Sequence, residues 1–210
     1  MKSNEISDKT QKRLEKIIEV AFDMFLKKGY ANTSLNDIVT KSGGSLSTIY
    51  NYFHNKEGLF KAILEKGVKN FFAQIDKKID INQSLSIEEF LYHFSDVYLD
   101  TVLNDRAISF YKLVFGENGT KDTNLKKILY EYESKSINKI LYDFFKKDKN
   151  IYKFIDSDLQ TVAMSFWISV REPFFYKKLL FDEKINITKK QKDEHINKKI
   201  NIFLHGNLKS

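Results

Sequence analysis

The chain contains 210 residues, 42% of them hydrophobic, and this length is sufficient for a sizeable core. It has no cysteine, which excludes disulfide frameworks and thiolate metal sites, and its net charge of +7 favours a polyanionic partner. No apolar stretch approaches the ~18 residues of a membrane span, and the polar N-terminus lacks a signal-peptide core. We therefore expect a cytoplasmic protein with no membrane partner.

Helical periodicity runs through nearly the whole sequence. The chain has only one proline and eight glycines, so few residues force a break. This pattern predicts an all-α fold of about nine helices. The first helix is expected over residues 9–28, where the apolar positions form one stripe that can serve as a packing platform. The stripe consists of Leu14, Ile17, Ile18, Ala21, Phe22 and Phe25.

A second, shorter helix is predicted to begin near residue 35. Leu35, Ile38 and Val39 follow the i, i+3, i+4 spacing of an amphipathic helix. Thr33 or Ser34 can accept the free backbone N–H groups at its start. The short segment is therefore predicted to be capped by a side-chain hydroxyl.

A glycine turn separates this helix from a third. Gly43 stands where a helix C-terminus favours a residue with positive φ, and Ser45 can cap the helix that follows. Ile49 and Phe53 are expected to point inward. Two helices joined by a short glycine-containing turn form a helix-turn-helix, whose second helix enters the major groove of DNA. The remaining faces of that helix carry Leu46, Ser47, Thr48, Asn51 and Tyr52.

Residues 17–59 as a whole resemble the N-terminal signature of the TetR/AcrR family of transcriptional regulators. The matching residues are Ile17, Ala21, Phe25, Gly29, Tyr30, Thr33, Ser34, Asp37, Ile38, Gly43, Ser45, Thr48, Tyr50, Phe53, Lys56, Glu57 and Leu59. Within this family the chain looks most like the CmeR-like regulators of multidrug efflux pumps. The resemblance implies a palindromic double-stranded DNA operator, a dimer and a small-molecule inducer.

Side-chain chemistry suggests how the third helix would contact DNA. Ser47, Thr48 and Asn51 can donate to or accept from base edges, and Leu46 can contact a thymine methyl group. Phosphate contacts are expected from Tyr50, Tyr52 and Lys56, and the resemblance implies the same division. The alternative is that the two tyrosines pack beneath residues 9–28. The DNA-binding set is completed by Thr33, Ser34 and Ser45.

Gly44 departs from the family pattern, which usually has a branched apolar residue there. A second glycine beside Gly43 lowers the stability of the turn and of the following helix by about 1 kcal/mol. We therefore predict a recognition helix that frays without DNA and becomes ordered on binding.

The rest of the chain is predicted to form a helical bundle for ligand binding and dimerisation. We place the DNA-binding domain at residues 1–57 and this second domain at residues 58–210. Pro173 must bend or end the helix that precedes it. The residues expected to start helices are His54 or Asn55, Ser84 or Ser86, Asp105, Asn124, Asp156 or Ser157, and Thr188, with the last helix ending at Gly206.

Aromatic residues are denser after residue 63 than packing alone requires. With the sensing role that the resemblance implies, they suggest an apolar inducer site, although each could be an ordinary core residue. The expected ligand-binding residues are Phe94, Tyr98, Phe110, Tyr111, Tyr132, Ser136, Phe166, Trp167, Arg171, Phe175 and Tyr176.

Arg171 is the charged member of this set. It follows Trp167 by one helical turn and could hold the anionic group of a hydrophobic or amphipathic inducer. The alternative is an ion pair at the surface with Glu172 or another carboxylate. The sequence offers no metal-ligand or catalytic spacing, so neither a cofactor nor an enzymatic activity is expected.

Assembly and regulation follow from the resemblance. Residues 156–170 and 189–204 correspond to the helices that form a four-helix dimer interface in this family, although their apolar stripes could also serve the intrachain core. The expected function is a repressor of an efflux operon that an inducer releases. The alternatives are an activator or nucleoid-type DNA-binding factor without a ligand, and a helical membrane-surface or structural protein.

Overall fold

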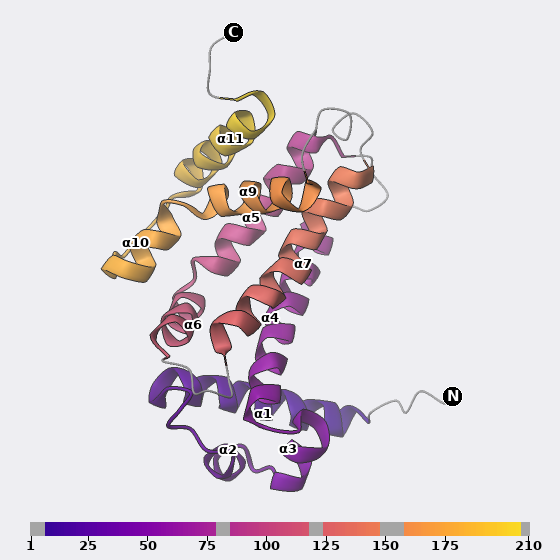
Figure 1. The fold of residues 1–210 in the computed structure, drawn as a ribbon, viewed down its shortest axis with the longest axis vertical. Coiled ribbons are helices and arrows are strands. Elements are labelled where there is room, and N and C mark those ends of the chain that lie inside the picture. Colours follow the sequence, from indigo (N-terminus) through magenta and orange to yellow (C-terminus); the bar gives the residue numbers. More distant parts are fainter. Residues whose placement is uncertain (1–6, 79–84, 118–123, 148–157, 207–210) are drawn as a thin grey trace. The chain divides into compact units, whose positions relative to one another are not determined.

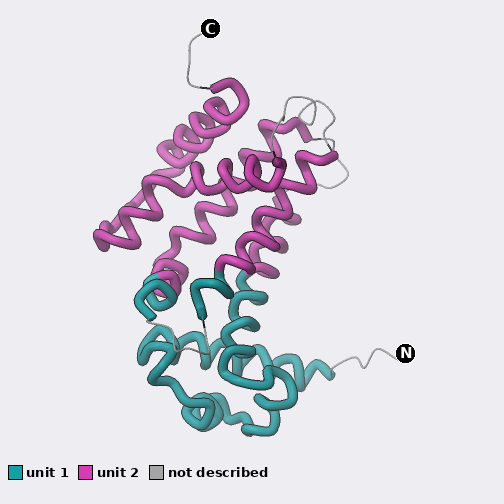
Figure 2. Tube along the Cα trace, viewed as in Figure 1, with its two compact units in different colours: residues 1–67, 112–129 teal, residues 68–111, 130–210 magenta. Residues whose placement is uncertain are grey.

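The computed structural model describes residues 7–78, 85–117, 124–147 and 158–206 (Figure 1). Every regular element in these residues is an α-helix, which confirms the predicted all-α fold. The chain forms two compact units (Figure 2). The first comprises residues 1–67 and 112–129, and the second comprises residues 68–111 and 130–210. The functional boundary expected at residue 57 remains a prediction.

The first unit contains α1 (Asp8–Lys28), α2 (Leu35–Ser42), α3 (Leu46–Phe53) and the first part of α4 (Lys56–Lys78). Its core is aromatic and aliphatic, because α1 buries the stripe that includes Ile17, Ala21 and Phe25. The Tyr30 ring joins α1 to α4, with ring centroids 5.1 Å from Phe25 and 5.9 Å from Phe60. The long helix α1 is thus the platform for α2, which in turn contacts α3.

The second unit is organised around α5 (Ile87–Val102), which contacts both α9 (Leu159–Arg171) and α11 (Lys189–His205). It also contains α10 (Phe174–Phe181). The central position of α5 explains why nine of its residues are buried, polar Ser95 and Asp96 among them. Asp96 is paired with Lys78 of α4 and with Lys192 of α11, so one carboxylate links three helices.

Three helices contribute residues to both units. They are α4, α6 (Asp105–Gly116) and α7 (Leu125–Lys147). Each is an uninterrupted α-helix, so the two units are connected by helical backbone at three places. None of the described helices is long and apolar enough to cross a membrane.

Side-chain caps define most helix starts as expected. Ser34, Ser45, Ser86 and Thr188 are the N-caps of α2, α3, α5 and α11, and the Asn55 amide oxygen accepts the Gly58 N–H at the start of α4. The expectation for α9 was wrong, because Asp158 is its cap. Residues 156 and 157, which the sequence favoured, lie outside the described residues.

Helix α9 ends just before Pro173, as predicted. The helix stops at Arg171, before Pro173. A further helix, α10, then begins at Phe174, and the sequence analysis did not anticipate it. Its start is stabilised because the Glu172 carboxylate accepts the Tyr176 N–H at 3.1 Å.

Candidate nucleic-acid interface and buried aromatic cluster

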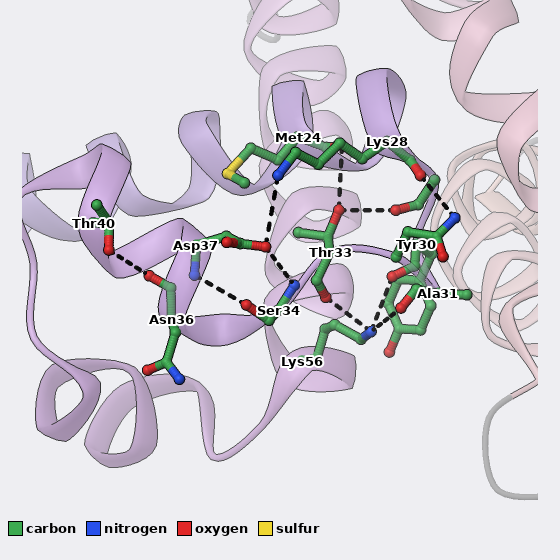
Figure 3. Close-up of polar contacts among 12 residues, drawn as sticks. Met24, Lys28, Tyr30, Ala31, Thr33, Ser34, Asn36, Asp37, Thr40 and Lys56 are labelled. Carbon is green, nitrogen blue, oxygen red and sulfur yellow. Dashed lines mark hydrogen bonds and ion pairs between the residues drawn. The ribbon is translucent and has the colours of Figure 1, made fainter.

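The start of α2 is fixed by a reciprocal pair of hydrogen bonds. Ser34 Oγ accepts the Asp37 N–H at 3.1 Å, and Asp37 Oδ2 accepts the Ser34 N–H at 3.3 Å. These bonds, with a more distant contribution from Lys28, hold the pKa of Asp37 below its ordinary value. Figure 3 shows the pair together with the ion pair between Lys28 and Asp37. The beginning of the helix-turn-helix is therefore held tightly in place.

The turn between α2 and α3 is made by a glycine in the left-handed region. Gly43 has φ 71° and donates its N–H to Val39, a conformation that a residue with a Cβ adopts only with strain. Ser45 then caps α3, because its Oγ accepts the Thr48 N–H at 3.2 Å. Both features agree with the sequence-based expectation.

The outer face of α3 is open to solvent. Ile49 and Phe53 are buried, as expected, whereas Tyr50 and Tyr52 are 54% and 44% exposed. The alternative in which these tyrosines pack beneath α1 is therefore excluded. Among the other predicted DNA-binding residues, Ser34, Ser47 and Asn51 are exposed, and Ser45, Leu46 and Thr48 are half-buried.

Two predicted DNA-binding residues are engaged inside the domain. Thr33 is only 1% exposed, and its hydroxyl donates to the carbonyl oxygens of Met24 and Gly29. Lys56 Nζ donates to the carbonyl oxygens of Tyr30, Ala31 and Thr33 at 2.9, 3.3 and 3.0 Å (Figure 3). The buried Thr33 side chain thus serves the fold, which corrects its place in the predicted contact set.

Lys56 also has an electrostatic role in the turn. Its ammonium lies 4.5 Å from the Tyr30 ring centroid, which allows a cation–π contact. Burial lowers the pKa of Lys56, and the charge of Glu117 opposes that effect. Because all three donors of this ammonium point to carbonyls, a phosphate contact would compete with these bonds. Its role at the DNA remains a prediction.

Sequence reasoning missed Glu117. Its Oε1 accepts the backbone N–H groups of Tyr30 at 2.8 Å and Ala31 at 3.1 Å. The segment from Gly29 to Thr33 is therefore held by a carboxylate on its N–H groups and an ammonium on its carbonyls. No signal in the sequence indicates this contact, because Glu117 is 87 positions from Tyr30.

Gly58 is the second residue that the analysis missed. A Cβ at this position would lie 1.7 Å from the carbonyl oxygen of Phe53. Phe53 is the last residue of α3. Only glycine permits so close an approach of α4 to the end of α3. Glycine in the first turn of a helix lowers helix stability. Its presence there could therefore have indicated, from the sequence alone, a close backbone approach.

Most of the predicted ligand-binding residues lie together in the second unit. Tyr98 lies 5.8 Å from the ring centroids of both Phe94 and Trp167, and Tyr111 lies 4.8 Å from that of Phe175. Tyr132 and Ser136 are half-buried, whereas Tyr176 is exposed and contacts Phe181 instead. The buried members of the set are Phe94, Tyr98, Phe110, Tyr111, Phe166, Trp167 and Phe175.

Arg171 combines the two environments proposed for it. Its guanidinium carbon lies 5.1 Å from the Trp167 ring centroid and 4.4 Å from that of Phe175. Its Nε is also 3.4 Å from a Glu172 carboxylate oxygen. The alternative ion pair is therefore present, but the guanidinium is largely buried among aromatic rings rather than at the surface.

A second carboxylate belongs to this buried cluster. The Tyr111 hydroxyl donates to Glu133 Oε1 at 2.6 Å. Burial raises the pKa of Glu133, while the Tyr111 hydrogen bond and the Arg171 charge oppose that effect. Burial likewise raises the pKa of Tyr98 well above its ordinary value. We call Tyr98, Tyr111, Glu133, Trp167, Arg171 and Phe175 the buried polar cluster.

Comparison with known proteins gives consistent results. Residues 17–63 match the family model of the bacterial regulatory proteins of the tetR family. The chain is 37% identical to the HTH-type transcriptional repressor ComR of Escherichia coli over 62 residues, or 30% of each protein. It is 25% identical over 205 residues to IcaR of Staphylococcus aureus, the negative regulator of the icaADBC biofilm operon, covering 90% of this chain and 98% of IcaR.

The fold is also found among solved structures. The solved structure of the flavonoid-responsive regulator FrrA superimposes on this chain with a TM-score of 0.71. The two sequences are 22% identical, and the match covers 92% of this chain and 96% of FrrA.

Proposed function

We propose that the chain is a TetR-family repressor that binds a palindromic operator as a homodimer, because residues 17–63 match the family model of the bacterial regulatory proteins of the tetR family. The observation that carries this proposal is the solvent-exposed face of α3, where Tyr50 and Tyr52 project from a helix whose inner side is anchored by Ile49 and Phe53. A helix held in this way can enter the major groove without rearrangement of its core. ComR and IcaR, which are similar to the chain, are both named as negative regulators or repressors.

Dimerisation supplies the second half-site. One module buries little DNA surface, and a two-fold dimer reaches half-sites about 34–36 Å apart. We assign the interface to residues 156–170 and 189–204. Their described parts belong to α9 and α11, which contact α5 and bury Ala163, Phe166 and Ile196. Half-exposed residues on the same helices, such as Val162 and Ile202, are available for a partner.

An inducer would bind the second unit. The aromatic residues around Tyr98 and Arg171 suit a hydrophobic or anionic amphipathic molecule, and FrrA, which shares the fold, is named as flavonoid-responsive. Ligand entry would shift α4 relative to α5, change the separation of the two recognition helices and weaken operator binding. Coupling of 1–3 kcal/mol corresponds to a factor of about 5 to 150.

The proposed target is an efflux operon beside the gene, and the proposed location is the cytoplasm, where that DNA lies. The proposed target rests on the CmeR-like resemblance of residues 43–60, 171–175 and 201–206.

The test is fluorescence-polarisation binding to DNA from upstream of the gene and its neighbours. Salt is held constant, because phosphate contacts make affinity strongly salt-dependent. A Tyr50→Ala variant should bind the selected site at least tenfold more weakly, whereas Tyr130→Ala, a matched change at a tyrosine 57% exposed on α7, should bind as the parent does. Equal loss in both variants, or binding to every site at the non-specific level, would contradict the DNA-binding role assigned to α3.

Ligand response is tested with the same complex. Release of the DNA by a hydrophobic or amphipathic compound, with a rise in melting temperature of the free protein, is expected. Selective DNA binding without any such response would indicate the alternative regulator that has no ligand.

A further inference from the structure

An open groove of about 440 Å³ lies between α1 and α2 in the first unit. Three lysines, one carboxylate and two uncharged side chains line it, which are Met24, Lys27, Lys28, Asp37, Thr40 and Lys41. We call it the lysine groove. Because its lining carries more positive than negative charge, it favours an anionic partner.

The charged side chains of the lysine groove are not equivalent. Lys28 Nζ lies 3.7 Å from Asp37 Oδ2, and Figure 3 shows this ion pair reaching from α1 to α2. Lys27 and Lys41 are exposed and have neither an ion pair nor a hydrogen bond within the described residues. Both stand in the last turn of their helices, where the helix dipole favours a cation but does not occupy its donors. The groove therefore presents two ammonium groups that no carboxylate balances.

The lysine groove adjoins the predicted DNA-binding surface. Its Asp37 carboxylate accepts the Ser34 N–H, and Ser34 Oγ accepts the Asp37 N–H. Ser34 is exposed and belongs to the predicted DNA-binding set. In a helix-turn-helix the first helix, here α2, crosses the sugar–phosphate backbone while the second enters the major groove. A groove on the flank of α2 is thus within the region where a DNA backbone is expected.

The chemistry of the lining suits that backbone. A lysine ammonium is a compact charge that commonly pairs with phosphate. Met24, which is 5% exposed, contributes an apolar surface to the same groove. Proteins contact both the phosphates and the sugars of DNA, and the lining offers a counterpart for each.

We propose that the lysine groove binds the DNA backbone beside the recognition helix, with Lys27 and Lys41 contacting phosphates. This inference rests on the proposed DNA-binding function and adds a contact region on α1 and α2 that the sequence analysis did not include. Phosphate contacts carry no sequence information. The groove therefore provides affinity and salt dependence, whereas the exposed face of α3 provides selectivity.

The test is fluorescence-polarisation binding of the full chain to operator and to unrelated DNA at several salt concentrations. The groove variants are Lys27→Gln and Lys41→Gln. Each phosphate contact contributes about 0.9 to the slope of log affinity against log salt. Because a homodimer carries each lysine twice, each variant should reduce the slope by about 1.8 and the affinity at physiological salt by about tenfold or more. The loss should be equal for both DNAs, so selectivity is unchanged.

Three further variants make the result specific to the groove. Lys41→Arg keeps the charge and should keep the slope of the parent. Lys69→Gln removes an exposed lysine of α4 in the second unit, with the same change of net charge, and should also leave the slope unchanged. Asn51→Ala removes a predicted base contact and should lower selectivity with little change of slope. Because Lys27 and Lys41 are exposed, the groove variants should melt near the temperature of the parent.

The inference is overturned if both groove variants keep the slope of the parent, if Lys69→Gln reduces the slope equally, or if the groove variants lose selectivity instead of slope. A groove that takes an acidic polypeptide would bind labelled polyglutamate in the parent but not in Lys41→Gln, with equal DNA slopes throughout. That result would also refute the DNA contact.

The same measurements separate this failure from failure of the proposed function. A parent chain that binds its operator selectively, together with groove variants of unchanged slope, refutes the groove contact alone. A parent chain that binds every sequence alike, together with groove variants of reduced slope, refutes the repressor role alone. Absence of any DNA binding by the parent refutes both.

Discussion

Glu117 Oε1 lies 2.8 Å from the backbone nitrogen of Tyr30, so a residue that directly follows α6 holds the segment that precedes α2. The same helix carries Tyr111, whose hydroxyl donates to Glu133 in the buried polar cluster. One helix therefore carries at its end a contact to the helix-turn-helix, and near its middle a contact to the proposed ligand site.

Removal of the Glu117 carboxylate should loosen this segment. In Glu117→Ala the N–H groups of Tyr30 and Ala31 lose their acceptor, and we expect the free energy of unfolding to fall by about 1–2 kcal/mol. Amide hydrogen exchange at these two residues should accelerate. Glu117→Gln keeps an acceptor oxygen, so its loss in the free energy of unfolding should be less than half of the loss in Glu117→Ala. Identical behaviour of Ala, Gln and parent chains in urea unfolding and amide exchange would show that the contact has no energetic role.

Gly58 provides a second test, because the end of α3 occupies the space that a Cβ at this residue would need. The Phe53 carbonyl oxygen would lie 1.7 Å from an added Cβ, so Gly58→Ala must displace α3 or α4. We expect a loss of at least about 2 kcal/mol in the free energy of unfolding and weaker operator binding.

Gly67 is the matched control in the same helix. A Cβ there meets no atom within 4 Å, so Gly67→Ala should stabilise the chain by about 0.5–1 kcal/mol through helix propensity. Thermal unfolding of the two variants should shift in opposite directions. A Gly58→Ala variant with the melting temperature and DNA affinity of the parent would contradict the close approach of α3 and α4.

Interactions between residues close together in the sequence could be predicted, whereas those between distant residues could not. Ser34, Gly43 and Ser45 were predicted because caps and left-handed turns depend on residues three or four positions apart. The contacts of Lys56 with the carbonyls of Tyr30 and Ala31, and those of Glu117 with their N–H groups, join distant parts of the chain. No periodicity encodes such pairs.

The same reasoning explains the outcome for the aromatic residues. Their helical spacing predicted burial of Tyr98, Trp167 and Phe175. It could not show that Tyr176 would be exposed, because the turn at Pro173 changes the direction of the chain and starts a new helix. Nor could it show that the charge of Arg171 would interact with Glu133, since Glu133 comes from α7.

Asp96 should make the stability of the second unit depend on pH. Burial alone would raise its pKa, but hydrogen bonds from Lys192 and Lys78 outweigh that effect, so the pKa lies below its ordinary value of 3.8. Stability from a lowered carboxyl pKa is present above the unfolded value and is lost as pH falls through the folded value. The melting temperature should therefore fall steeply below about pH 4.

Asp96→Asn tests this assignment at pH 7. The change leaves Lys192 with Asp100 alone, at 2.7 Å, and should lower the free energy of unfolding by about 1–3 kcal/mol. It should also flatten the acid limb of the pH profile. The control is Asp143→Asn, which removes an exposed pair with Lys139 and should change stability by less than about 0.5 kcal/mol. An equal effect of the two substitutions would contradict the central role of Asp96.

The recognition helix offers the last prediction, because α2 and α3 have equal length but unequal caps. Each has eight residues. In α2, Ser34 and Asp37 bond reciprocally, whereas Ser45 of α3 accepts from Thr48 without a reciprocal bond from an acidic side chain. Gly44, directly before Ser45, adds backbone entropy to the unfolded turn. The cap and the glycine together make α3 the less stable helix by about 1 kcal/mol.

Amide hydrogen exchange of the free protein should therefore be faster at residues 45–52 than at residues 35–42, and operator DNA should slow it. The mechanism is that phosphate and base contacts order a helix whose own cap is incomplete, so part of the binding free energy is used in ordering. Slow exchange at residues 45–52 both with and without DNA would instead mean that α3 is preformed. In that case the contact of α3 with α4 through Gly58 would be sufficient to hold the recognition helix without its ligand.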